Sequence, residues 1–132
     1  MDKVGQAKQI SVKVENKIGA GAELIRLLAD AEVNVIAFIG WTADPAYGIL
    51  QFITGDYAKA KKAMKKARFE TTATDVVWAE IPNRPGALAD AAEKLAAAHV
   101  NIEYAYATTG GRKDALAVFR VDKPAKALKA LA

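Results

Sequence analysis

The sequence contains no cysteine, a single histidine and a single serine. Without cysteine, disulfides and thiolate metal sites are excluded. A catalytic zinc site usually takes two or three histidines, which the sequence does not supply. Ser11 lies in a predicted strand and His99 at a predicted helix end, so they make a poor nucleophile–base pair. We therefore predict no catalytic residue, no metal ligand and no cofactor.

Long apolar runs are also missing, since no segment approaches the roughly 18 residues of a membrane span. The first eight residues lack the charged-then-apolar pattern of a signal peptide. Hydrophobic residues make up 52% and charged residues 26%, the balance of a soluble globular protein. These features predict a cytoplasmic protein without membrane contact. The net charge of +4 permits nucleic-acid binding without requiring it.

An internal repeat is the strongest positive feature, because the sequence matches itself without a gap after a shift of 67 positions. Residues 16–20 align with 83–87, and residues 33–35 align with 100–102. Both aligned pairs contain an asparagine at the same place. Two copies of one structural module are predicted.

Each copy shows the same order of periodicities. In the first copy, apolar residues alternate over 10–14, then recur at helical spacing from 24 to 31. Two further apolar strands follow at 34–41 and 48–54, and a second helix begins at Asp56. The second copy has the equivalent elements 67 positions later, with Pro124 at the start of its second helix.

The segment 69–75 is rich in β-branched residues and predicts the fourth strand of the first copy. The second copy ends at Ala132, at its last helix, so no residues remain for its fourth strand. We therefore predict an α+β protein of two ferredoxin-like βαββαβ modules, with helices on one face of antiparallel sheets. Residues 1–74 form module 1 and residues 75–132 form module 2, whose last strand is apparently missing.

One motif resembles a known family. The turn Asn83-Arg-Pro-Gly-Ala-Leu88 joins a predicted strand to a helix, and Val100-Asn101-Ile102 opens the next strand. This pattern resembles the ACT domain, and its duplication over nearly the whole chain resembles stand-alone tandem ACT proteins that bind amino acids. The resemblance implies a regulatory function, with a regulated enzyme or transporter as the partner.

The resemblance also implies an amino-acid site at the interface between modules. The ligand would contact the loop after the first strand, the start of the first helix, and the second strand of a neighbouring module. In the second copy these positions are Asn83, Arg84, Pro85, Gly86, Ala87, Leu88, Asn101 and Ile102. In the first copy they are Asn16, Gly19, Ala20, Asn34 and Val35.

Such a loop suits a zwitterion, because a helix start offers free N–H groups to a carboxylate and asparagine can bind either end. The alternative is that Pro-Gly only forms the turn and Asn only caps it. Likewise, Arg84 is either a carboxylate partner or a solvated cation. The first copy departs from the pattern at Ile18 and Gly21, which replace the expected Pro and Leu.

The residue before each Val-Asn pair is usually Gly in the family, but here it is Glu32 or His99. If the position needs a positive φ, either residue is strained there. His99 is expected to meet the free carbonyls of a helix end. The Gly19-Ala-Gly21 turn lacks the third glycine of a dinucleotide loop, so such a site is rejected.

A dense basic run, from Lys59 to Arg68, is predicted to cover the solvated face of a helix. The alternative is binding to RNA or to an acidic partner. No RNP-like run of glycine and aromatics is present, so nucleic-acid binding is not favoured.

Large apolar residues are predicted on both faces of the sheet, because Ile36 and Phe38 alternate with Val35, and Trp78 alternates with Val77. This pattern predicts a homodimer in which a second chain covers the open face. The favoured function is a non-catalytic amino-acid sensor. The alternatives are a structural or regulatory subunit with degenerate pockets, an RNA-binding ferredoxin-like protein and a small enzyme of similar fold.

Overall fold

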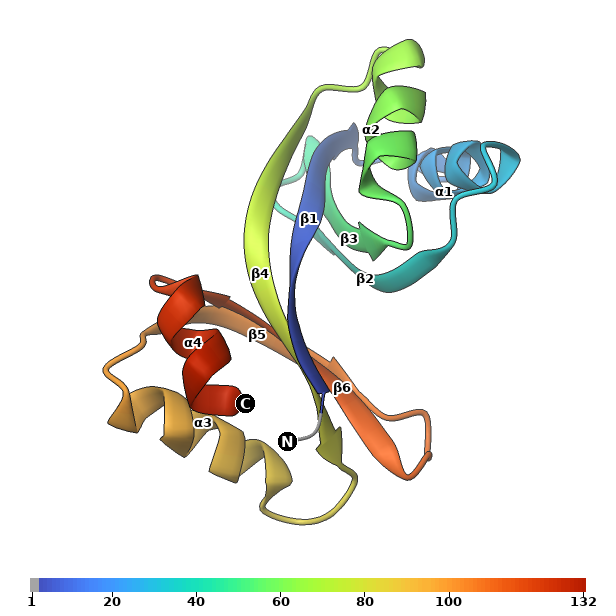
Figure 1. Ribbon diagram of the computed structural model, residues 1–132. Helices are drawn as coiled ribbons and strands as arrows, with labels where there is room; N and C mark the ends of the chain where they lie inside the picture. The colour runs from blue at the N-terminus through green and yellow to red at the C-terminus, as the bar shows by residue number, and fades with distance from the viewer. Residues whose placement is uncertain (1–2) are drawn as a thin grey trace. The chain divides into compact units, whose positions relative to one another are not determined.

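The computed structural model describes residues 3–132, which form two compact units of strands and helices (Figure 1). Residues 8–74 form one unit, here called the N-unit, and residues 3–7 with 75–132 form the other, the C-unit. The elements are β1 (Lys3–Glu15), α1 (Ala20–Asp30), β2 (Val35–Thr42), β3 (Tyr47–Thr54), α2 (Tyr57–Lys66), β4 (Thr71–Pro82), α3 (Ala87–Ala97), β5 (Ile102–Thr108), β6 (Asp114–Val121) and α4 (Pro124–Leu131).

Within the N-unit the strand order is β2-β3-β1-β4, with α1 and α2 on one face. Its core includes Leu24, Leu28, Phe52 and Met64, each at most 1% exposed. These are the apolar positions that the helical and strand periodicities predict. Asp56 caps α2 as expected, because its Oδ1 accepts a hydrogen bond from the Lys59 N–H at 3.0 Å.

Within the C-unit the strand order is β1-β4-β6-β5, with α3 and α4 packed on one face. Its core includes Val77, Leu95, Phe119 and Leu131, each at most 1% exposed. Pro124 stands in the first turn of α4, where its missing N–H has no consequence. The predicted α+β fold of two ferredoxin-like modules is confirmed.

The fourth strand of the C-unit comes from the beginning of the chain. Residues 3–7 of β1 lie beside β4, and Val4 packs against the C-unit core. A Cβ on Gly5 would lie 2.5 Å from the Trp78 ring, so the indole covers the backbone there. In a βαββαβ module this strand is expected after the second helix. The strand precedes its module instead, because β1 and β4 each continue from one unit into the other.

A β-bulge changes which residues share a face in β2. The register shifts between Val35 and Ala37, so Ile36 has no cross-strand partner and Phe38 lies opposite Phe52. Opposite residues share a face, so Phe38 is on the helix-covered side, at the sheet edge. The sequence alternation, which paired Phe38 with Ile36, is wrong here.

In the C-unit, Trp78 lies opposite Val118 on the face away from the helices, since the neighbouring Val77 and Phe119 belong to the core. Tyr106 shares that face, because it also lies opposite Val118. Large aromatic groups therefore do occupy the open face of this unit. β5 carries a second register shift between Ile102 and Tyr104, the position equivalent to the bulge in β2.

Three helices end in a left-handed residue that is not glycine: Glu32 and His99 at φ 59° and Arg68 at φ 67°. Each end has a six-residue backbone hydrogen bond, such as the Val100 N–H to the Leu95 carbonyl at 2.9 Å. The positive φ that the sequence analysis considered for Glu32 and His99 is therefore present.

Candidate functional site

The two bends that precede α1 and α3 have the same backbone conformation. Gly19 has φ 89° and ψ −8°, and Gly86 has φ 88° and ψ −13°. An L-residue adopts this region with strain, which explains glycine at both places. A Cβ on Gly19 would meet nothing within 4 Å, and one on Gly86 would meet only Arg84 Nη1 at 3.9 Å. The space in front of each bend is open within the described residues.

Neither helix start has a side-chain cap. At α3 the Ala87 N–H donates to the Arg84 carbonyl at 3.2 Å, and the first intrahelical bond runs from Asp90 to Gly86. The N–H groups of Leu88 and Ala89, which lie between them, have no backbone acceptor among residues 3–132. The corresponding N–H groups at α1 belong to Gly21 and Ala22. Both helix starts therefore offer two free donors in a region of partial positive charge.

Asn16 and Asn83 hold the bends against the neighbouring hairpins. The Asn16 Nδ2 donates to the Pro45 carbonyl at 3.1 Å, and the Asn83 Nδ2 donates to the Arg112 carbonyl at 2.8 Å. The backbone N–H groups of both asparagines donate to the same hairpins, at 3.0 and 2.9 Å. The amide nitrogens therefore have a structural role, which leaves the side-chain oxygens as the groups that a ligand can meet.

Arg84 lies against its own helix start. Its Nη1 donates to the Pro85 carbonyl and its Nη2 lies 3.3 Å from Asp90 Oδ2. Both partners of this ion pair are more than half exposed, so a ligand carboxylate can compete for the guanidinium. Asp90 is a partner that the sequence pattern did not predict.

Asn34 and Asn101 lie at the opposite helix ends, after α1 and α3. Because α3 has 11 residues, its ends are about 16 Å apart. Within one unit, therefore, the structure does not bring Asn101 and Ile102 together with the 83–88 bend, nor Asn34 and Val35 with the 16–20 bend. A complete site of the predicted kind needs the strand start of a neighbouring module.

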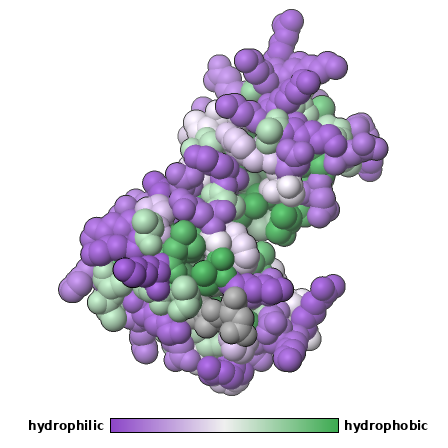
Figure 2. All heavy atoms as spheres, in the orientation of Figure 1, coloured by the Kyte–Doolittle hydropathy of each residue, from purple (hydrophilic) through white to green (hydrophobic). Residues whose placement is uncertain are grey.

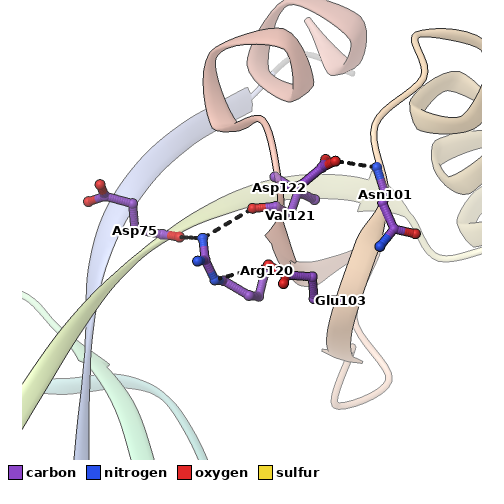
Figure 3. Close-up of polar contacts among 6 residues, drawn as sticks. All are labelled: Asp75, Asn101, Glu103, Arg120, Val121 and Asp122. Atoms are coloured by element: carbon purple, nitrogen blue, oxygen red, sulfur yellow. Dashed lines mark hydrogen bonds and ion pairs between the residues drawn. The ribbon is translucent and has the colours of Figure 1, made fainter.

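The start of β5 is held firmly in place (Figure 3). The Asn101 N–H donates to Asp122 Oδ1 at 2.9 Å. Arg120 Nη1 donates to the carbonyls of Asp75 and Val121, and its Nε lies 3.4 Å from Glu103 Oε1. The Asn101 backbone is thus fixed, and its exposed side chain points away from these contacts (Figure 3).

Two hollows flank the bend of the C-unit. One, of about 180 Å³, lies between the start of α3 and the end of β5, and small or apolar side chains such as Ala87, Leu88 and Ala107 line most of it. The other, of about 420 Å³, has three cationic and three acidic side chains around Pro82 and Ala87. These charged residues are Lys3, Arg84, Lys94, Glu80, Asp90 and Asp114.

The bend of the N-unit differs at two positions. Ile18 stands in place of Pro85 and is fully exposed, and Gly21 stands in place of Leu88. In the second bend, Pro85 therefore restricts the backbone and Leu88 provides an apolar side chain, and the first bend has neither.

The hairpin residues that support each bend were missed by sequence reasoning. Thr108, Thr109 and Arg112 lie beside the second bend, next to the Gly110-Gly111 turn. The proximity of this turn to the bend depends on strand register, which one sequence does not reveal.

The described residues include no group of three or more His, Asp or Glu side chains placed to hold a metal ion. Over residues 3–132, no helix is both long and apolar enough to cross a membrane.

The fold and the paired glycine bends define a chain of two ferredoxin-like modules. The family model of the ACT domain pair matches residues 6–131, so the chain belongs to this family and the predicted resemblance is confirmed. No curated protein matches the sequence significantly.

Solved structures agree with this assignment. Protein BT0572 from Bacteroides thetaiotaomicron shares 37% identity and a TM-score of 0.89, over 97% of this chain and 88% of that one. The regulatory subunit of aspartate kinase from Thermus thermophilus, in a ligand-free form, shares 18% identity and a TM-score of 0.71, over 97% and 93%. The same subunit from Thermus flavus shares 20% identity and a TM-score of 0.67, over 97% and 94%. The similarity to the two Thermus proteins is one of fold.

Proposed function

We propose that this ACT domain pair is a non-catalytic cytoplasmic sensor that binds a free amino acid at an interface between ACT modules and regulates a partner protein. Family membership supports the class of function. Similarity in fold to two regulatory subunits of aspartate kinase supports a regulated enzyme as the partner.

The observation that carries the proposal is the pair of uncapped helix starts behind Gly19 and Gly86. Free N–H groups and the helix dipole hold a ligand carboxylate there. The ligand ammonium then needs an acceptor, and a side-chain oxygen of Asn34 or Asn101 from a neighbouring module is suited to this role. The site needs a second module because the two ends of each helix are about 16 Å apart, and we propose that a homodimer supplies it.

The second bend is the better ligand site, since it has Pro85, Leu88 and the small apolar hollow beside them. The first bend, with exposed Ile18, favours a degenerate or purely structural site. We therefore propose that ligand binding depends on the C-unit bend.

Thermal unfolding in the presence of each of the twenty amino acids tests the proposal. A ligand that binds the native state at about 100 times its Kd adds about 2.7 kcal/mol to the free energy of unfolding. We expect one amino acid, or a small related group, to raise the Tm.

Two variants test whether the ligand that raises the Tm binds at the C-unit bend. Gly86→Ala and Gly111→Ala both place a side chain at positive φ, so both lower the Tm without ligand. Only Gly86→Ala should abolish the ligand-induced rise. A flat response of the parent protein to all twenty amino acids would contradict the sensor function.

A further inference from the structure

The outer face of α2 carries an unusual concentration of positive charge. Five lysines of the helix and Arg68 beyond its end are all exposed. No acidic residue occurs between positions 57 and 69. Among the described residues, none of the six cations forms an ion pair with an acidic side chain. Figure 2 shows hydrophilic side chains gathered at the upper end of the view, where α2 lies.

The needs of the helix itself explain only part of this charge. Lys65 and Lys66 lie in the last turn, where cations interact favourably with the helix dipole. Lys59 lies in the first turn, where the dipole opposes a cation, and Lys61 and Lys62 lie mid-helix, where the dipole favours neither sign of charge. Like charges also recur at i,i+4 spacing, from 61 to 65 and from 62 to 66, and such pairs repel each other.

The equivalent helix of the C-unit lacks the extra charge. Lys126 and Lys129 of α4 align with Lys59 and Lys62, but Leu128 stands where α2 has Lys61, and Ala132 where it has Lys65. The fold therefore does not require the additional lysines of α2.

The buried side of α2 limits what its basic face can bind. Ala60 and Met64 are fully buried in the N-unit core, so no apolar face remains to enter a lipid bilayer. Tyr57 packs against the same core, and Lys61 Nζ lies 6.0 Å from its ring centroid. No other aromatic lies within the helix, so it offers no platform for stacked bases.

We propose that the basic face of α2 is a docking surface for an acidic helical segment of a partner protein. Glutamates at i, i+3 and i+7 on such a segment repeat the spacing of Lys59, Lys62 and Lys66. Binding then relieves the repulsion among the lysines. The identification of this partner as the regulated protein rests on the function proposed above.

The test uses a fluorescently labelled helical peptide with glutamates at this spacing, titrated with the full chain and followed by anisotropy. Lys61→Gln with Lys62→Gln removes two charges from α2. Lys126→Gln with Lys129→Gln removes two charges from α4 and is the matched control. We expect about five-fold weaker peptide binding by the α2 variant and less than about two-fold change in the control. Added salt should weaken binding by the parent protein.

Several results would overturn this assignment. They are absence of peptide binding, equal weakening by both double variants, and tighter binding to a single-stranded RNA oligonucleotide or to phosphatidylserine vesicles than to the peptide. The same variants should keep the full amino-acid-dependent rise in Tm. The docking surface and the amino-acid site can therefore fail separately.

Discussion

Asn16 and Asn83 have the same structural role in the two units. Each side-chain nitrogen donates to a hairpin carbonyl, at 3.1 and 2.8 Å. The sequence leaves both a capping role and a binding role open for these residues. The contact found is neither a helix cap nor a ligand contact, but a bond from the bend to the adjacent hairpin.

The hydrogen bond from Asn83 Nδ2 to the Arg112 carbonyl predicts that the side-chain donor contributes to the free energy of unfolding. Asn83→Asp removes the donor and places a carboxylate against the Arg112 carbonyl, so we expect a loss of about 1 kcal/mol or more in the free energy of unfolding. Urea unfolding of both proteins measures this difference in the free energy of unfolding. Asn34→Asp, at an exposed side chain, is the control and should change stability by less than about 0.5 kcal/mol. Equal effects of the two substitutions would contradict the structural role of Asn83.

Tyr106 lies on the open face of the C-unit sheet, where burial and then the nearby Tyr104 raise the pKa of its phenol to about 12. The unfolded chain ionises near the usual pKa of about 10, so between these values the native state binds more protons than the unfolded state. The free energy of unfolding should therefore fall as pH rises from 10 to 12. Tyr106→Phe should reduce this slope in denaturant titrations, and an unchanged slope would show that Tyr106 is not responsible.

At the scale of elements, the helix ends show a local conflict between sequence and conformation. α3 ends in His99 at φ 59°, a conformation that costs a non-glycine residue about 1–2 kcal/mol. The six-residue bond from Val100 to Leu95 and the buried Val100 hold the chain there nonetheless.

Replacing His99 with glycine should therefore stabilise the protein. His99→Gly removes the strain but adds flexibility to the unfolded chain, which leaves a net gain of about 0.5–1 kcal/mol. Ala98→Gly, one residue earlier at φ −88°, has no strain to relieve and should destabilise. Thermal unfolding of both variants checks the expectation, which fails if His99→Gly lowers the Tm.

The strands β1 and β4 account for the part of the fold that sequence analysis did not resolve. Each is long enough to serve two units, with 13 and 12 residues. The Gly5 backbone lies under the Trp78 ring, which belongs to a segment some 70 positions later.

This arrangement predicts that a change at Gly5 acts on the C-unit. Gly5→Ala puts a methyl group 2.5 Å from the indole, so the ring must move, at a cost of about 1–3 kcal/mol. In a Trp41→Phe background, tryptophan fluorescence then reports Trp78 alone. Gly55→Ala, whose methyl group has ordinary contacts, is the control. An unchanged Trp78 spectrum in Gly5→Ala would contradict the placement of residues 3–7.

Local signals predicted most of the elements but not their register. Periodicity predicted the helices and core positions such as Leu24 and Phe52. The Asn-Arg-Pro-Gly turn predicted the bend before α3. The bulge at Ile36 was not predictable, because residues 35–39 are all apolar and show no alternation whose phase an extra residue could shift. Long-range pairing of residues 3–7 with β4 likewise leaves no local signature.

At the scale of the molecule, the two modules share one architecture but differ in chemistry. The C-unit has the preset bend, the small hollow and the mixed-charge hollow, and the N-unit has the basic helix. This division favours a protein in which one module binds the ligand and the other contacts the partner. Because each helix separates its bend from its strand start, the proposed site also requires two modules to meet.

Amide NMR spectra during titration with the amino acid that raises the Tm test the central claim most directly. The account predicts that the largest shift changes occur at the Gly86, Leu88 and Ala89 amides, where the helix start of α3 receives the carboxylate. Gly110 and Gly111 in the hairpin turn should change less. Shift changes that spare residues 86–89 while a ligand is bound would contradict the account.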